Sequence, residues 1–110
     1  MVTKNQIGES KVIEYYRKKG CVVYHFVIKG RRNNLNEKKG TPDFLIRKDN
    51  ERFYVEEKTD MCGLSLYQEE VIQDLLSRGE MVVLARYDTK NKKLKLWKLN
   101  MMELLDEVTI

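Results

Sequence analysis

Two apolar runs with charged residues at their ends decide the fold: Gly40-Thr41-Pro42-Asp43-Phe44-Leu45-Ile46 and Arg52-Phe53-Tyr54-Val55-Glu56-Glu57-Lys58. Both runs are rich in β-branched and aromatic residues, which is typical of strands. The polar segment Asp49-Asn50-Glu51 lies between them and favours a turn. We therefore expect residues 44–46 and 52–56 to pair as a β-hairpin.

The segments on either side of this hairpin alternate between helical and strand patterns. We expect helices over residues 6–19 and 65–78, since apolar positions recur at helical spacing and Gly20 and Gly79 follow as stop signals. Further strands are expected over residues 21–28, 81–85 and 93–99, and a short helix over residues 100–106. This order predicts an α/β fold, a central mixed β-sheet flanked by helices, in one domain spanning residues 1–110.

Length and composition narrow the class of protein further. The chain has 110 residues, of which 42% are hydrophobic and 35% charged, as expected for one small soluble domain. No apolar run approaches the ~20 residues that span a bilayer, and the first six residues lack a secretion signal. One histidine and two cysteines make a zinc site or a Ser-His-Asp triad poor candidates. We expect a cytoplasmic protein, encoded by a bacterium or a phage, with no membrane partner.

A basic segment follows the first predicted strand. The net charge is +4, and five cations surround an Asn-rich stretch: Lys29, Arg31, Arg32, Lys38 and Lys39. Such a loop suits a DNA phosphate backbone, because each cation that contacts a phosphate releases condensed counterions. A solvated charged loop with no partner explains the same residues equally well.

The ends of the predicted hairpin strands carry acidic residues and a lysine. Asp43 opens the first strand, while Glu56 and Lys58 are two residues apart on the second and leave the same face. Buried paired carboxylates are costly unless a cation neutralises them, and two hard oxygen ligands suit Mg²⁺ or Mn²⁺. Lys58 could orient or deprotonate an attacking water, or offset charge on the phosphate. These parts suit metal-assisted phosphodiester hydrolysis.

The run Gly40-Thr41-Pro42-Asp43, followed by Glu56-Glu57-Lys58, resembles the PD-(D/E)xK signature of restriction-endonuclease-like nucleases. The later pattern, Gly63-Leu64-Ser65-Leu66-Tyr67-Gln68, a helix, Gly79 and the strand Val82-Val83-Leu84, is similar to the VRR-NUC branch of that superfamily. The resemblance covers residues 9–86. Single-domain members of this branch resemble Holliday junction resolvases.

The resemblance implies a role for each matching residue. Asp43 and Glu56 would bind the metal with the backbone carbonyl of Glu57, and Lys58 would be the catalytic lysine. A glutamate on the first helix also belongs to the family's site; Glu9 fits that position, and Glu14 is the competitor. Gln68 matches a site glutamine, although Ser65-x-x-Gln68 is also a capping box, and the two roles are compatible.

The resulting hypothesis is an Mg²⁺- or Mn²⁺-dependent DNA endonuclease that cleaves branched DNA such as Holliday junctions. Symmetric cleavage of a four-way junction needs two active sites, so we expect a homodimer. A nickase or flap nuclease with loose structural preference is the alternative within the class. A DNA-binding module without hydrolysis is the alternative outside it. The apolar residues Met101, Met102, Leu104 and Leu105 favour a core or dimer contact.

Overall fold

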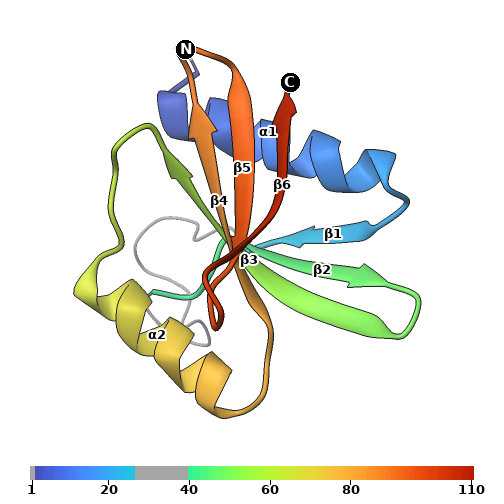
Figure 1. The fold of residues 1–110 in the computed structure, drawn as a ribbon, viewed down its shortest axis with the longest axis vertical. Coiled ribbons are helices and arrows are strands. Elements are labelled where there is room, and N and C mark those ends of the chain that lie inside the picture. The colour runs from blue at the N-terminus through green and yellow to red at the C-terminus, as the bar shows by residue number, and fades with distance from the viewer. Residues whose placement is uncertain (1, 27–39) are drawn as a thin grey trace.

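The computed structural model describes residues 2–26 and 40–110, and its strands form one mixed sheet (Figure 1). Within these residues the sheet has six strands in the order of the chain. The strands are β1 (Val22–His25), β2 (Phe44–Lys48), β3 (Glu51–Thr59), β4 (Val82–Asp88), β5 (Lys93–Lys98) and β6 (Glu103–Thr109). The helices are α1 (Lys4–Lys18) and α2 (Leu66–Ser77). The predicted α/β class with a mixed sheet is confirmed.

The centre of the sheet is the parallel pair β3 and β4. All other neighbours pair antiparallel, including the predicted β2–β3 hairpin, in which Phe44 lies opposite Val55. Parallel strands need a long crossover connection, and here α2 provides it. Because β3 lies between the hairpin partner β2 and the crossover partner β4, its side chains meet residues from both.

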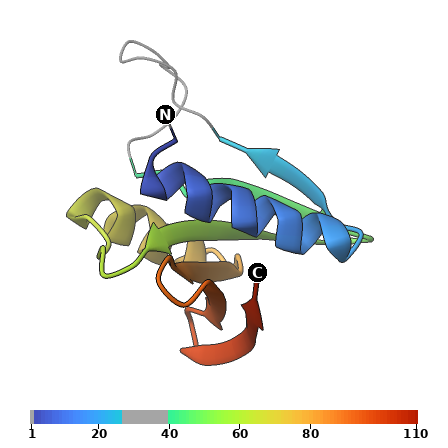
Figure 2. The same ribbon diagram turned by 90° about the horizontal axis from the view of Figure 1, so that it is seen from above.

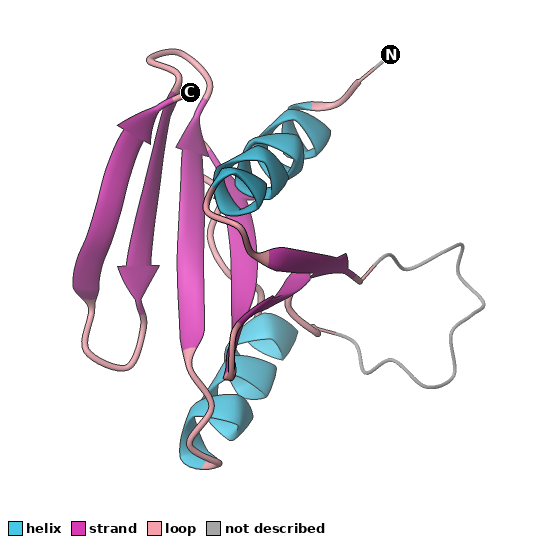
Figure 3. Ribbon diagram, turned by 90° about the vertical axis from the view of Figure 1, so that its right-hand side faces the viewer, coloured by secondary structure: helices cyan, strands magenta, loops and turns pink. Residues whose placement is uncertain are grey.

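The two helices pack against opposite faces of the sheet (Figure 3). Alternate residues of β4 divide between the two apolar clusters: Val83 packs with Val12 and Tyr16 of α1, whereas Val82 packs with Ile72 of α2. Seen from above, α1 runs along β3 on the side where β1 also lies (Figure 2). Among the described residues, no helix has the length and apolar character that crossing a membrane requires.

The predicted helix over residues 100–106 is wrong. Asn100 and Met101 lie in a tight turn in which Met102 adopts a φ of 51°, and the chain then returns as strand β6 beside β5. A helix of seven residues has little stability of its own, while pairing along β5 gives its backbone groups hydrogen-bond partners. The pairing also places Val108 opposite the buried Leu94.

The apolar residues near this turn are exposed, so the expectation that they form core is wrong. The exposed fractions are 65% for Met101, 68% for Met102, 49% for Leu104 and 42% for Leu105. Leu104 and Leu105 belong to β6, which is an edge strand of the described sheet. The other interpretation of these residues, a dimer contact, stays a prediction.

Helix α1 approaches β3 closely at Gly8. A Cβ atom at this position would lie 2.1 Å from Oε2 of Glu57 and 2.7 Å from Oγ1 of Thr59. Gly8 is buried, although glycine within a helix costs about 1 kcal/mol relative to alanine. The close packing of α1 on β3 therefore depends on the missing side chain.

We predict that Gly8→Ala lowers the free energy of unfolding by about 1–3 kcal/mol, because α1 must shift away from β3. Urea unfolding measures the change. Glu57→Ala is the control, because it removes the side-chain atoms nearest to position 8. In the Glu57→Ala protein, Gly8→Ala should lower the free energy of unfolding by less than it does in the wild type. A Gly8→Ala protein as stable as the wild type would contradict the packing argument.

Candidate active site

Glu56, a carboxylate on the central strand, is almost completely buried. Its exposed fraction is 1%, and its side chain lies on the face of β3 that α2 covers. Gln68 of α2 donates a hydrogen bond from Nε2 to Oε2 of Glu56 over 2.9 Å. Lys58 Nζ lies 3.8 Å from the same oxygen. The predicted site residues Glu56, Lys58 and Gln68 are thus brought together.

The other oxygen of Glu56 has no such partner. Oε1 is buried and accepts no hydrogen bond from an N–H or O–H group of the described residues, although the carboxyl groups of Glu56 and Asp43 interact with each other. Burial, together with the negative charge of Asp43, raises the pKa of Glu56 to about 9. A buried carboxylate oxygen without a donor is costly, and a bound cation would satisfy it.

Asp43 lies beside Glu56 at the start of β2. Its Oδ2 accepts a hydrogen bond of 2.9 Å from the backbone N–H of Glu57. Burial raises the pKa of Asp43, although this hydrogen bond and the Lys58 ammonium oppose the rise. The hairpin therefore brings an acidic residue from each of its two strands to one place, as the sequence predicts.

The side chain of Glu57 points to the opposite face, toward α1, as predicted from strand alternation. It is 5% exposed, and its Oε2 accepts a hydrogen bond of 2.8 Å from the Thr59 hydroxyl. Burial raises the pKa of Glu57 to about 7. A metal-binding role for its backbone carbonyl stays a prediction.

Of the two candidate glutamates on α1, Glu9 is the one that lies near this cluster. Burial and the Asp43 charge raise the pKa of Glu9, while His25 lowers it. Its Oε1 lies 3.6 Å from Nε2 of His25. Glu14 instead forms ion pairs with Lys11 and Lys18 and is 43% exposed.

His25 lies next to the cluster, a position for which the local sequence gives no signal. The imidazole stacks on Phe44, with ring centroids 4.5 Å apart, and pairs with Glu9. Only the pairing register, which places His25 opposite Phe44 and so next to Asp43, could have indicated this position. That register depends on how β1 aligns with β2, which the sequence pattern does not specify.

Gln68 caps helix α2 and also contacts Glu56, while its role in catalysis stays a prediction. Its backbone N–H donates to the Ser65 hydroxyl over 3.1 Å, and its Oε1 accepts from the Ser65 backbone N–H over 2.8 Å. These two bonds form the capping box of α2. The remaining amide Nε2 is thereby aimed at Glu56, so helix capping fixes the orientation of the site glutamine.

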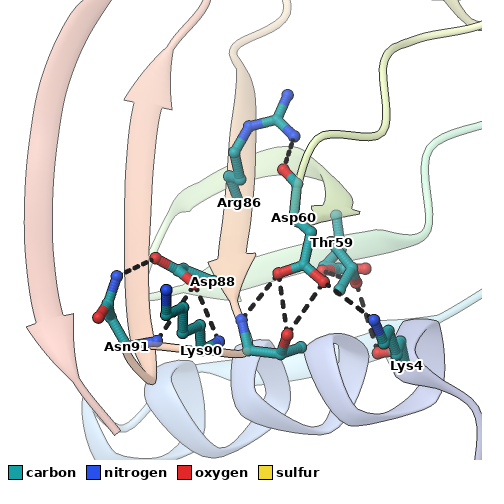
Figure 4. A network of polar contacts seen from close by, with 9 residues as sticks. Lys4, Thr59, Asp60, Arg86, Asp88, Lys90 and Asn91 are labelled. Atoms are coloured by element: carbon teal, nitrogen blue, oxygen red, sulfur yellow. Dashed lines mark hydrogen bonds and ion pairs between the residues drawn. The ribbon is translucent and has the colours of Figure 1, made fainter.

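The loop between Lys58 and α2 is fixed by a polar network (Figure 4). Asp60 accepts hydrogen bonds from the backbone and hydroxyl of Thr89, and Arg86 donates to the backbone carbonyls of Asp60 and Cys62. Lys4 at the start of α1 lies 3.8 Å from Asp60. This network ties the end of β3, which carries Lys58, to β4 and α1.

Gly40 holds the segment before Asp43 against the start of α2. It adopts a φ of +90°, and a Cβ atom there would lie 2.5 Å from the backbone oxygen of Tyr67. Only glycine combines this conformation with so close an approach. The glycine of the Gly40-Thr41-Pro42-Asp43 motif thus sets the distance between Asp43 and the helix that carries Gln68.

The predicted DNA-binding cations Lys29, Arg31, Arg32, Lys38 and Lys39 lie outside the described residues. Their contribution stays a prediction.

The residues of the cluster suit a hard divalent cation. Asp43 and Glu56 supply carboxylate oxygens, and Oε1 of Glu56 has no donor among the described residues. Mg²⁺ is often held by only one or two carboxylates, with waters and substrate phosphate completing its shell. Within residues 2–26 and 40–110, no three or more His, Cys, Asp or Glu side chains gather as a metal cage. The two carboxylates are the part of the cluster whose chemistry is compatible with Mg²⁺ or Mn²⁺.

Comparison with known proteins supports the fold. The structure is similar to that of Hjc, a Holliday junction resolvase from the archaeal hyperthermophile Archaeoglobus fulgidus, with a TM-score of 0.64 and 14% sequence identity. The similarity covers 94% of this chain and 86% of that one. It confirms that the two proteins share an α/β fold. No family model and no curated protein matches the sequence, so membership of the VRR-NUC family stays a prediction.

The two roles of Gln68 can be separated with Ser65→Ala as the control. Ser65→Ala should lower the free energy of unfolding by about 1 kcal/mol. It should leave DNA cleavage near the wild-type rate, because the Ser65 backbone N–H that orients the Gln68 amide is kept. Gln68→Ala should be destabilised to a similar degree and should also cleave about tenfold more slowly, because a hydrogen bond to a charged group is lost.

Urea unfolding and single-turnover cleavage rates measure the two effects. A Gln68→Ala protein that is destabilised but cleaves at the full rate would leave capping as the only role of Gln68.

Proposed function

We propose that this protein is an Mg²⁺- or Mn²⁺-dependent DNA endonuclease that acts on branched DNA such as Holliday junctions. One observation carries the proposal: the buried Glu56 carboxylate, with an oxygen that lacks a donor, lies beside Asp43 and within 3.8 Å of Lys58. If these residues served only the fold, two carboxyl groups would be buried beside a single cation, Lys58. Burying a second carboxylate without a counter-charge costs free energy of folding.

The shared fold with an archaeal Holliday junction resolvase supports this proposal for the class of substrate. At 14% identity the likeness extends to the fold alone, so the chemistry is argued from the residues of this chain. Asp43, Glu56 and Lys58 match the PD-(D/E)xK pattern residue by residue, and the hairpin pairs the strands that carry them.

Asp43 and Glu56 would hold the metal ion, which supplies Lewis-acid stabilisation of the phosphodiester and activates water. Lys58 is held near the carboxylates and 16% exposed, so its ammonium can reach a phosphate oxygen or the attacking water from this side. Gln68 fixes the Glu56 carboxylate by donating to Oε2, which leaves Oε1 for the cation. Glu9, near Asp43, completes the acidic set on the α1 side.

We also propose that the active protein is a homodimer, because symmetric cleavage of a four-way junction needs two such sites. The exposed apolar residues Met101, Met102, Leu104 and Leu105 are the surface that we assign to the contact between subunits. A nickase or flap nuclease with loose structural preference is the second candidate. The intact acidic and lysine set favours both over a non-catalytic DNA-binding module.

We predict that Asp43→Asn abolishes cleavage, with a rate loss of at least about 100-fold, while DNA binding largely survives. The substitution removes a metal ligand but no surface cation. Asp49→Asn is the matched control, since Asp49 lies at the exposed hairpin turn with a φ of 56°, a conformation that asparagine tolerates.

Labelled four-way junction, flap, nicked and linear duplex DNA are incubated with each variant in Mg²⁺ or Mn²⁺. Paired cleavage of the junction alone supports the resolvase, and cleavage of the flap or nicked DNA supports the second candidate. A wild-type protein that binds but never cleaves would establish the non-catalytic module, and cleavage by Asp43→Asn would remove Asp43 from the metal site.

We further predict that Mn²⁺ raises the melting temperature of the wild-type protein, because an ion that binds only the folded state stabilises it. The gain is about 2.7 kcal/mol at a metal concentration of about 100 times Kd. Asp43→Asn should abolish the shift, and Asp49→Asn should retain it. Thermal unfolding with and without chelator measures this, and an equal shift in both variants would place the ion elsewhere.

A further inference from the structure

A groove of about 470 Å³ runs along β1 and β2, outside the cluster of carboxylates. Aromatic and apolar side chains of Tyr24, Phe26 and Leu45 form its floor, and Arg47 and Arg52 lie at its far end. Asn50 and Glu51 of the hairpin turn complete the described lining. Aromatic rings interleaved with arginines are the pattern that single-stranded nucleic acids use as a stacking surface.

This part of the sheet is not covered by α2. The helix packs on Tyr54 of β3 and on Val82 of β4, while the residues of β1 on the same face stay open. Tyr24 is 45% exposed and Val22 is 54% exposed. Leu45 pairs with Tyr24 of β1 on one side and with Tyr54 of β3 on the other. The groove therefore begins at the edge of the area that α2 covers.

The groove lies next to the candidate active site. The backbone N–H of Phe26 donates to the carbonyl of Asp43 over 2.8 Å, and Leu45 of β2 is two residues after Asp43, which directly precedes that strand. A DNA strand whose phosphate lies at Asp43 and Glu56 would therefore have its neighbouring nucleotide above Phe26 and Tyr24.

Two arginines at the far end of the groove form a positively charged site. Arg47 lies directly opposite Arg52 in the β2–β3 register, and like charges in this position are destabilising. Glu80 compensates Arg52 with an ion pair of 2.8 Å, but no ion pair to Arg47 forms within residues 2–26 and 40–110. Arginine forms strong paired hydrogen bonds with phosphate, so a DNA backbone would supply the missing counter-charge.

We propose that this groove binds the unpaired bases of a single DNA strand next to the cleaved phosphodiester, with bases stacked on Tyr24 and Phe26 and a phosphate on Arg47. Its assignment to a strand of the substrate rests on the proposed function. Flapped or frayed DNA offers such bases next to a duplex, and a four-way junction offers them only where a base pair beside the crossover is opened. In a fully paired duplex the bases are stacked within the helix. The groove is therefore a source of selectivity for branched or frayed DNA.

The test measures binding without chemistry, in buffer that contains EDTA. Fluorescence anisotropy gives the affinity for an oligothymidylate of about 12 nucleotides and for a blunt duplex of the same length. The variants are Tyr24→Ala, Tyr24→Phe, Arg47→Ala and, as the matched control, Lys48→Ala. Lys48 is exposed on the same strand, and its position after Arg47 places it on the opposite face.

Tyr24→Ala should weaken binding of the single strand about tenfold and leave duplex binding within about twofold, and Tyr24→Phe should retain wild-type affinity. Arg47→Ala should flatten the salt dependence for the single strand by about 0.7 in log–log slope, and Lys48→Ala should not. Cross-linking with bromodeoxyuridine DNA should map to Tyr24 or Phe26. Unchanged single-strand affinity in Tyr24→Ala, or an equal loss for both DNAs, would overturn the proposal.

This outcome is independent of catalysis. One outcome is that the wild-type protein cleaves no DNA in Mg²⁺ or Mn²⁺ while Tyr24→Ala weakens binding of the single strand. In that case the nuclease proposal fails and the assignment of the groove to single-stranded DNA is supported. If cleavage is intact and Tyr24→Ala binds as the wild type does, the groove assignment fails alone.

Discussion

The burial of Glu56 on the central strand is the constraint on which the rest of the structure depends. Removing a carboxylate from water costs several kcal/mol unless its oxygens are matched by donors or cations. Here Gln68 and Lys58 approach one oxygen, and none of the described residues donates to the other. The fold compensates part of this cost, and the metal ion of the proposed function would compensate the remainder.

The chain topology explains how these few partners reach Glu56. The antiparallel β2–β3 pairing brings Asp43 alongside, and the β3–α2–β4 crossover carries Gln68 over the same face. Two local features fix the distances between these residues. Gly40 allows the segment before β2 to approach α2 closely, and the hydrogen bonds of Asp60 hold the loop that follows Lys58. The site is therefore built from segments that lie far apart in sequence but meet at one junction of the sheet.

The sequence predicts which residues meet around Glu56, because strand alternation and helix capping in this region point to the same arrangement. Strand alternation alone separates Glu56 and Lys58 from Glu57, and the Ser65-x-x-Gln68 capping box places Gln68 in the first turn of α2. Both features arise from bonds between near neighbours. The strands and helices of the core, from α1 to β5, were predicted for the same reason, with boundaries that differ from the structure by a few residues.

Where the sequence failed, the decisive interaction was between distant segments. The chain after Asn100 has apolar residues that suit a helix, but the open edge of β5 provided backbone partners, and the segment became β6. His25 was missed because its proximity to Glu9 depends on the register between β1 and β2. A single sequence contains no direct signal for either long-range pairing.

The same pairing register links the candidate chemistry to a candidate means of substrate selection. Asp43 directly precedes β2 and is two residues before Leu45, so both lie on one face. Tyr24 of β1 pairs with Leu45, and Phe26, just after β1, lies beside Asp43. The face that presents the carboxylates at one end thus presents aromatic rings next to them and arginines beyond. Moving the register by one residue would send the rings to the α1 face, where Phe44 and Ile46 are buried. Packing of Phe44 and Ile46 against α1 therefore keeps both the acids and the rings on the opposite face of the sheet, so the hydrophobic core specifies which surface would meet the proposed DNA strand.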